Sequence, residues 1–307
     1  MRLEDLNYFL AVAEMSHVGR AAQKLGTTQP ALTKGIQRLE RELRLQLFER
    51  TPKGMALTSV GKAFFERARH VRFGLDEAIK EANDLHLGNI GLIRAGIAPA
   101  YADNFFAEAC SELLHQRPAA RMEITVGLND ALLSALHLGD LDFCISALPK
   151  PAPPEFQQKP LFNDSLYIVA RENHPLFYGP SLRFTDLAQE SWILPGRSVS
   201  ARRSIEARFN QYGLPAPNVV IESNSSIISL IKVVKATNLL TVTSASSLGQ
   251  SISTGIRRIL LSEAMWPREI GITTRRGAYL SPLTLRFFDL LEQHGALYAR
   301  QLNSDAS

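Results

Sequence analysis

The sequence has little of what marks a membrane-spanning, secreted or metal-binding protein. The longest stretch without a charged residue, 236–256, is rich in serine, threonine and glycine and makes a poor membrane span. Charged residues interrupt the apolar pattern of the first ten positions, so no secretory signal is predicted. The seven histidines lack metal-ligand spacing, and we expect no metal and no cofactor. Together these absences predict a cytoplasmic protein.

Signatures of catalysis are missing as well. The chain has no G-x-S-x-G elbow, P-loop, dinucleotide fingerprint or cluster of histidine, aspartate and serine, so no catalytic residue is predicted. Cys110 falls in an expected helix and Cys144 in an apolar run, and both positions suit a small buried side chain. A redox regulator that uses these two thiols stays open as an alternative. An α/β enzyme and a solute-binding protein are weaker alternatives.

Basic charge is concentrated at one end of the chain. Residues 1–75 contain 13 lysines and arginines against 7 acidic residues, whereas the whole chain of 307 residues carries a net charge of +4. Neutralisation of phosphates supplies much of the affinity of DNA-binding proteins. The asymmetry therefore favours a nucleic-acid-binding segment in the first quarter of the chain, although most basic stretches taken alone are only solvated surface.

The stretch 27–48 predicts the helix around which the neighbouring segments are organised. Its apolar residues recur every third or fourth position and form one stripe, at Leu32, Ile36, Leu39 and Leu43. One of the threonines at 27 and 28 can cap the helix, and Pro30 suits its first turn, so the helix starts near Gln29. A shorter helix is expected over 18–25. This order of short helix, turn and longer helix is typical of a helix-turn-helix, whose second helix enters the major groove.

Two short extended runs about a turn are predicted over 47–57. Proline and glycine stand in the turn 51–54 where such a turn requires them. The hairpin would be the wing of a winged helix-turn-helix, with Arg50 and Lys53 reaching phosphate or the minor groove. A first helix is expected over 4–15 and packs under the helix-turn-helix.

Residues 6–69 closely resemble the N-terminal domain of LysR-type transcriptional regulators. The matching elements are YFLAVAE, RAAQKL, QPAL, LE.EL, LFER and LTSVG, in that order. The remaining two thirds of the chain resembles the effector-binding region of the same family more loosely. The resemblance implies double-stranded DNA, a small-molecule effector and further copies of the chain, in a homodimer or homotetramer, as partners. It leaves RNA polymerase open as another partner.

The resemblance and the side-chain chemistry point to one set of DNA contacts. Gln29 can make two hydrogen bonds to adenine, and Pro30 can pack on a thymine methyl. Lys34 and Arg38 lie further along the helix and are expected to contact phosphates. Gly35 is unusual inside a helix, where it costs about 1 kcal/mol relative to alanine, and close approach to DNA is one explanation. The candidate DNA-binding residues are Thr28, Gln29, Pro30, Thr33, Lys34, Arg38, Arg50 and Lys53.

A long helix is predicted over 59–87. Its apolar residues follow an alternating four-three spacing for three heptads, which is typical of a coiled-coil seam. At 1.5 Å per residue the helix would reach about 43 Å, too far to pack wholly on its own small domain. The resemblance implies a dimerisation linker, and a helix packed on its own chain is the alternative. The candidate dimer contacts are Phe64, Val71, Leu75, Ala78, Ala82 and Leu85.

From residue 92 onward, apolar strands alternate with helical segments. Strands are expected over 92–98, 122–126, 141–147, 165–170, 192–194, 219–222, 239–242 and 270–274, and helices over 102–115, 129–138, 199–212, 225–235 and 282–301. Such alternation favours a parallel sheet covered by helices. Two α/β subdomains crossed twice by the chain make a periplasmic-binding-protein-like module, which the resemblance also implies.

Four turns of this module are expected at the carboxyl ends of strands, where open α/β sheets bind ligands. They supply neutral donors and acceptors, and the arginines at 197, 202 and 203 could hold a carboxylate. We therefore expect a small organic anion, such as an aromatic acid or a sugar acid, although any one of these residues could instead merely cap its helix. The candidate effector-binding residues are Pro99, Ala100, Tyr101, Asn129, Arg197, Ser198, Val199, Ser200, Arg202, Asn224 and Ser225.

The sequence thus predicts an α/β protein with an α-rich winged helix-turn-helix domain over 1–58 and a linker and dimerisation helix over 59–88. The effector-binding module follows, with subdomain I over 89–163 and 268–302 and subdomain II over 164–267. The predicted function is that of a sequence-specific DNA-binding transcription regulator. Its activity would be controlled by an effector held between the two C-terminal subdomains.

Overall fold

The chain divides into two units, Met1–Asn83 and Asp84–Ser307. Each unit has a hydrophobic core of its own. The computed structural model describes residues 1–51, 54–87, 91–179, 181–197, 199–223, 230–248 and 253–305.

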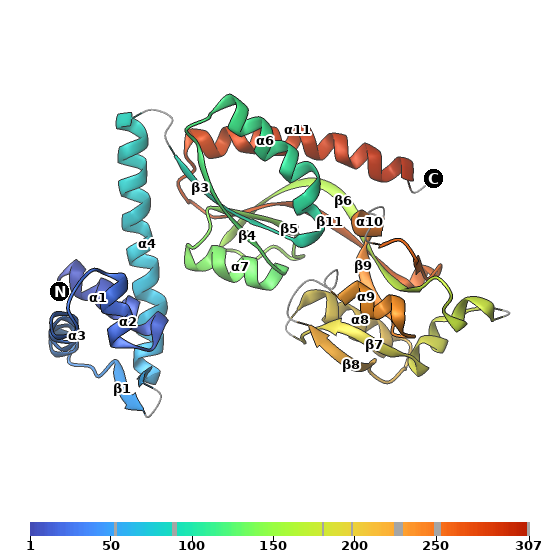
Figure 1. Cartoon of the computed structure of the whole chain (residues 1–307), viewed down its shortest axis with the longest axis horizontal. Helices are drawn as coiled ribbons and strands as arrows, with labels where there is room; N and C mark the ends of the chain where they lie inside the picture. Colours follow the sequence, from blue (N-terminus) through green and yellow to red (C-terminus); the bar gives the residue numbers. More distant parts are fainter. Residues whose placement is uncertain are drawn as a thin grey trace. The chain divides into compact units, whose positions relative to one another are not determined.

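The first unit is helical apart from one hairpin. In chain order its elements are α1 (Leu3–Met15), α2 (Val18–Lys24), α3 (Gln29–Leu43), β1 (Phe48–Thr51), β2 (Gly54–Leu57) and α4 (Ser59–Leu87) (Figure 1). The apolar stripe expected on α3 is buried, with Leu32 and Leu39 fully inaccessible in the core that α1 also lines. β1 and β2 pair antiparallel, as a wing requires. The predicted helix-turn-helix and hairpin are confirmed.

The hairpin is tied to the helices by hydrogen bonds from its backbone amides. Oε1 of Glu40, on α3, accepts the amide of Phe48 at 3.1 Å, and Met55 donates its amide to the carbonyl of Ser16 at 3.1 Å. Gly54 has φ +123°, and a Cβ at this position would lie 2.4 Å from the same carbonyl oxygen. Glycine is therefore needed where the wing meets the α1–α2 turn.

The first half of α4 packs on its own unit, as far as Arg72, whose Nη1 donates to Oδ1 of Asn7 at 2.8 Å. The ring of Phe64 lies 5.2 Å from that of Phe9, so this predicted dimer contact belongs to the core of its own chain. Further along, Val71 is 62% exposed. The other described seam positions are half-buried or exposed, namely Leu75, Ala78 and Ala82. The side chain of Leu85 lies outside the described residues.

The second unit is built on a mixed sheet with helices around it. Its strands are β3 (Leu92–Ile97), β4 (Arg121–Val126), β5 (Phe143–Ala147), β6 (Phe156–Arg171), β7 (Ser191–Pro195), β8 (Asn218–Ser223), β9 (Thr241–Ser244), β10 (Ile256–Arg258) and β11 (Met265–Arg275). Its helices are α5 (Pro99–Tyr101), η1 (Ala102–Phe106), α6 (Ala107–Gln116), α7 (Asn129–Leu138), η2 (Pro175–Tyr178), η3 (Phe184–Gln189), α8 (Ser200–Gln211), α9 (Ile231–Ala236), α10 (Ala245–Leu248), η6 (Ser262–Ala264) and α11 (Pro282–Asp305).

Two strands are much longer than the sequence predicts. β6 begins at Phe156 rather than near residue 165, and β11 begins at Met265 rather than near residue 270. They pair antiparallel, whereas β3 pairs parallel with β4 and β5. In the described part of the chain the main sheet runs in the order β10, β6, β11, β5, β3, β4, with β9 also paired to β6. The predicted parallel pairing is thus confirmed for β3, β4 and β5 and is also present between β7 and β8, whereas the pairs that β6 and β11 form are antiparallel.

The helix expected over 102–115 is broken near its start. Asn104 has φ −113° and ψ −129°, and a regular helix, α6, begins only at Ala107. Part of the helix expected over 225–235 lies outside the described residues, and α9 covers its end.

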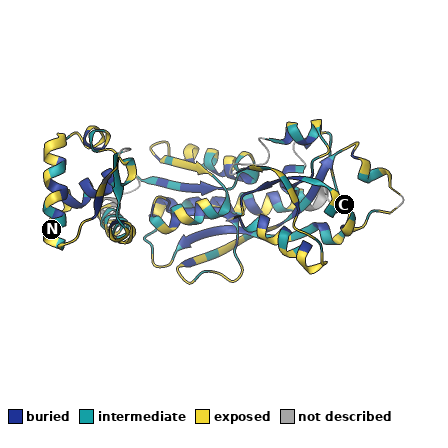
Figure 2. Ribbon diagram, turned by 90° about the horizontal axis from the view of Figure 1, so that it is seen from below, coloured by how far each residue is buried: buried dark blue, intermediate teal, exposed yellow. Residues whose placement is uncertain are grey.

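Two hydrophobic cores follow one another along β6 and β11. Phe162 and Ile270 belong to the first core, whereas Leu166 belongs to the second. Between them Asp164 on β6 is paired in register with Arg268 on β11. Both strands run side by side from one core to the other (Figure 1). The strands β5 and β9 are almost wholly buried, whereas the edge strand β4 and the outer faces of helices are exposed (Figure 2).

Candidate DNA-binding surface and effector cavity

The start of α3 presents polar side chains to solvent. Thr28 caps the helix, since its hydroxyl accepts a hydrogen bond at 3.3 Å from the amide three residues further on. Pro30 lies in the first turn, as predicted. Gln29, Pro30 and Lys34 are exposed, and Thr33 is half-buried. These candidate residues are gathered on one helix end that can enter a major groove.

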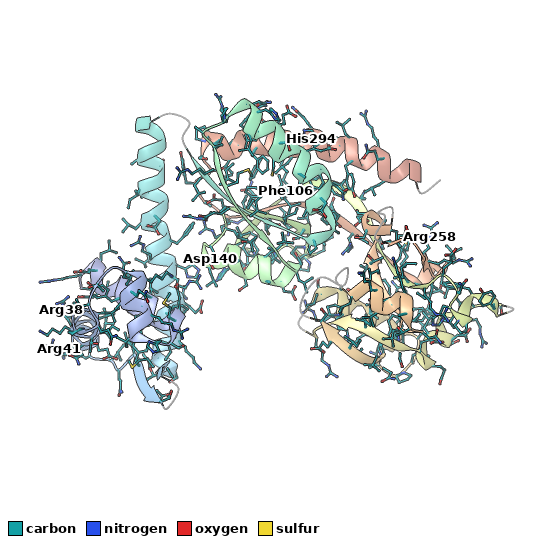
Figure 3. The ribbon with its side chains drawn as sticks, in the orientation of Figure 1. Arg38, Arg41, Phe106, Asp140, Arg258 and His294 are labelled. Atoms are coloured by element: carbon teal, nitrogen blue, oxygen red, sulfur yellow. The ribbon has the colours of Figure 1, made fainter. Side chains whose placement is uncertain are left out.

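Arg38 has a structural partner instead of a free guanidinium. Its Nε donates to Oδ2 of Asp5 at 2.7 Å, and its Nη2 donates to the other carboxylate oxygen. The Asp5 side chain is fully buried, and the hydrogen bond to it raises the pKa of Arg38. Figure 3 labels Arg38 on α3. Arg38 therefore balances the buried carboxylate of Asp5, on α1, and its expected phosphate contact stays a prediction.

Gly35 is explained by helix packing. It is buried, and a Cβ there would lie 2.4 Å from Cδ2 of Tyr8 and 2.9 Å from Oδ1 of Asp5, both on α1. Glycine therefore lets α1 and α3 approach closely. This packing explains the glycine inside the helix, in place of the close approach to DNA that we considered from the sequence.

The tip of the wing is not part of the described structure. The side chain of Arg50 and the whole of Lys53 lie outside the described residues, so their DNA contacts stay predictions.

A cavity of about 520 Å³ lies in the second unit, at the carboxyl ends of β3, β5 and β7. Its wall contains residues of both cores. The predicted residues that line it are Pro99, Ala100, Tyr101, Asn129, Val199 and Ser200. Arg197 is exposed and does not line the cavity. Ser198, Asn224 and Ser225 lie outside the described residues.

Arg202 does not reach the cavity. Its side chain is 3% exposed, and its Nε donates to Glu206 at 2.6 Å, one turn along α8. Arg203, which the sequence also offered for a carboxylate, lines the wall instead. One residue step turns a helical side chain by about 100°, so Arg202 and Arg203 point in different directions, and only Arg203 is turned toward the cavity.

Residues from strands, from the loop after β5 and from α8 and α10 complete the wall and were missed. They are mostly small hydroxyl-bearing or charged side chains, namely Ser146, Lys150, Ser204, Thr243, Ser244, Ser247, Arg268 and Glu269. Ser146 donates to Oδ1 of Asn129 at 2.5 Å, which orients the amide nitrogen of Asn129 as a donor for a ligand. The sequence signal was a polar residue inside an otherwise apolar strand, as at Ser146.

A buried polar network stands behind one wall of the cavity. The hydroxyl of Tyr101 donates to Oδ2 of Asp164 at 2.6 Å, and Nη2 of Arg268 donates to the same oxygen at 3.2 Å. The amide of Ser165 occupies the other oxygen at 2.7 Å. Burial raises the pKa of Tyr101 well above its usual value, so the hydroxyl stays protonated. Asp164 is thus fully engaged, and its charge is balanced by Arg268.

Two cations at the rim are exposed and form ion pairs. Lys150 lies 3.0 Å from Glu269, and Arg203 lies 3.8 Å from Asp130. Burial raises the pKa of Asp130, and the nearby arginine acts in the opposite direction. Exposed ion pairs contribute only about 0–1 kcal/mol, so a ligand carboxylate can compete for either cation.

Neither thiol is activated. Burial raises the pKa of Cys110 to about 11 and that of Cys144 to about 12. At neutral pH both therefore remain thiols, which gives the redox alternative no support. Among the described residues, no three histidine, cysteine or acidic side chains gather as metal ligands. In the same part of the chain, no helix is long and apolar enough to span a membrane.

A helix-turn-helix with a wing, attached to an α/β unit with a hydroxyl-lined cavity, defines a ligand-responsive DNA-binding regulator. Residues 3–62 match the family described as bacterial regulatory helix-turn-helix protein, lysR family, and residues 87–296 match the LysR substrate binding domain. The chain belongs to the LysR family. It is a DNA-binding transcription regulator with an effector-binding domain, and not an enzyme.

Individual relatives and structures agree with this assignment. The regulator GbpR of Azospirillum brasilense is 33% identical over 235 residues, covering 76% of this chain and 69% of the relative. The regulator YybE of Bacillus subtilis is 28% identical, covering 96% and 99%. A full-length OxyR variant from Pseudomonas aeruginosa has a TM-score of 0.66 at 24% identity, covering 97% and 95%. CbnR in complex with its target DNA has a TM-score of 0.64 at 22% identity, covering 96% and 100%, and both structures show the fold alone.

Proposed function

We propose that the exposed start of α3 contacts base edges of an operator, with Gln29 as the base-contacting residue and Lys34 as a phosphate contact. The observation that carries this proposal is the position of both side chains on one exposed helix end, while the apolar stripe of the same helix is buried. A helix held in this way can enter the major groove without losing its packing. Pro30 and Thr33 complete the surface.

Gln29→Ala is expected to weaken operator binding about tenfold and to relax sequence preference at one base pair, because a bidentate base contact contributes about 1–3 kcal/mol of discrimination. The operator is obtained by selecting duplexes from a random pool with the full-length protein, and affinity is measured by titration. Gln37→Ala, at an exposed position of the same helix, is the matched control. Unchanged affinity of Gln29→Ala for the selected duplex would contradict the proposal.

We further propose that the cavity holds the effector, a small organic acid that carries hydroxyl groups. The serine and threonine side chains of the wall and the amide of Asn129 suit hydroxyls. The carboxylate would lie at Lys150 and Arg203, whose ion pairs are exposed, rather than at Arg268, which already balances a buried aspartate. Trp266 supplies an aromatic face to the same cavity.

Arg203→Gln is expected to weaken binding of the effector acid about tenfold and to leave its uncharged amide analogue unaffected. A panel of aromatic, hydroxy and sugar acids is titrated against the full-length protein, and the fluorescence of Trp266 in the cavity wall reports binding. Arg197→Gln, at an exposed position outside the lining, is the control. If Arg203→Gln bound acid and amide as the unaltered protein does, the carboxylate would have to lie elsewhere.

The regulator is proposed to act in the cytoplasm as a homodimer or homotetramer, with RNA polymerase as a further partner. The exposed apolar side chains of α4, Val71 and Ile79, support a seam between two copies. Effector binding would act by favouring one arrangement of the DNA-binding units over another.

A further inference from the structure

His17 closes the start of α2 with its ring. Nδ1 accepts hydrogen bonds from the amide of Gly19 at 3.1 Å and from the amide of Arg20 at 3.3 Å. The ring thus takes the place of the serine, threonine or asparagine that usually caps a helix. A ring nitrogen that accepts hydrogen bonds carries no proton, so the neutral imidazole carries its proton on Nε2.

The Nε2–H group of His17 is a donor held in a fixed direction. The residue is exposed, and in the described part of the chain the hydrogen bonds of its ring are the two at Nδ1. Because those two bonds fix the ring, the donor on its far side is oriented before any ligand arrives. A preoriented donor loses little conformational entropy on binding.

Gly19 brings this ring beside Gln29. A Cβ at Gly19 would lie 2.9 Å from the amide nitrogen of the Gln29 side chain and 3.1 Å from Cε1 of His17. The two side-chain tips therefore border the same space, which glycine leaves open. Cε1 is bonded to Nε2 within the ring, so the free N–H lies near the residue proposed to contact a base.

We propose that His17 is a further DNA-contacting residue, whose Nε2–H donates to a phosphate oxygen beside the base pair that Gln29 contacts. The proposal rests on the proposed entry of Gln29 into the major groove. Phosphate oxygens receive half or more of the hydrogen bonds between proteins and DNA and fix the position of the protein on the duplex. A neutral ring adds a hydrogen bond without adding charge, which distinguishes His17 from Lys34.

His17→Ser separates the two roles of the ring, because serine caps a helix but its short hydroxyl does not extend to the position of Nε2. At pH 8, His17→Ser is expected to have the same melting temperature as the unaltered protein. It is expected to bind every duplex about three- to tenfold more weakly than the unaltered protein does. The dependence of affinity on salt is expected to stay the same, since no counterion is released by a neutral group. His17→Ala loses the cap as well and is expected to melt at a lower temperature.

Single methylphosphonate substitutions along the selected duplex locate the contact. At one position the substitution should weaken binding of the unaltered protein and leave His17→Ser unaffected. The proposal would be overturned if His17→Ser bound the selected duplex with unchanged affinity. It would also be overturned if His17→Ser lost affinity only for duplexes that are altered at one base pair. If Gln29→Ala binds normally, the proposed function itself fails; if Gln29→Ala is weakened and His17→Ser is not, only the role of His17 fails.

Discussion

Arg268→Met is expected to lower the free energy of unfolding of the second unit by about 3–5 kcal/mol. The cause is Asp164, whose side chain is fully buried and whose carboxylate lies 3.2 Å from Nη2 of Arg268. Methionine preserves much of the volume of the arginine stem but leaves the buried carboxylate without its cation. The hydrogen bonds from Tyr101 and from the amide of Ser165 remain, but neither supplies a positive charge.

Urea unfolding monitored by tryptophan fluorescence tests this expectation. The two tryptophans of the chain, Trp192 and Trp266, both lie in the second unit, so the signal reports that unit alone. Adding Asp164→Asn to Arg268→Met removes the buried charge and should restore about half of the loss or more. A loss below about 1 kcal/mol in the single variant would show that the carboxylate does not depend on this arginine.

Gly35→Ala is expected to destabilise the first unit by about 1–3 kcal/mol and to reduce operator binding. Helix propensity alone predicts the opposite, because alanine is more favourable than glycine by about 1 kcal/mol inside a helix. The added methyl group would lie 2.4 Å from the ring of Tyr8, so this ring or the whole of α1 must shift away from α3. The same shift would disturb the pairing of Asp5 with Arg38.

Thermal unfolding followed by circular dichroism measures this effect in the full-length chain. The midpoint of the unfolding transition monitored by tryptophan fluorescence should not change, because the first unit has no tryptophan. Gln37→Ala, exposed on the same helix, should change stability by less than about 0.5 kcal/mol. A first unit stabilised by Gly35→Ala would mean that α1 can move without cost and that the close approach of the helices is not required.

Local sequence signals were sufficient to predict the helices and the hairpin of the first unit. The threonine cap, Pro30 in the first turn and the apolar stripe of α3 all act within a few residues, so their pattern survives in the folded chain. The pairing of Arg38 with Asp5 joins residues 33 positions apart. Hydrophobic periodicity does not predict such a pairing. In the sequence, a basic helix face has the same pattern whether or not one of its arginines pairs with a distant carboxylate.

The sheet of the second unit was predicted less well because its longest strands are defined by pairing. The first residues of β6, including Gln157, Gln158 and Lys159, show no apolar alternation and become a strand only by hydrogen bonding to β11. Glycine and a shift of register at Ile270 and Gly271 further obscure the pattern of β11.

The cavity was predicted where turns precede helices and missed where strands supply the wall. Asn129 and Ser200 could be found because each starts a helix after a strand. Ser146 and Arg268 could not, because a strand residue joins a site only through the order of strands in the sheet, which is not a local property. Arg202 and Arg203 were indistinguishable until the rotation of α8 was known.

The paired course of β6 and β11 limits how the two walls of the cavity can move. The chain passes between the cores along these two hydrogen-bonded strands. A flexible loop between the cores would allow a large hinge motion. A two-stranded ribbon can only change its twist, and the change is distributed over all of its residue pairs. Asp164 and Arg268 lie opposite each other on this ribbon, between the two cores. Closure on a ligand would therefore be elastic and small in amplitude, and the ribbon would return the walls to their resting separation once the ligand leaves.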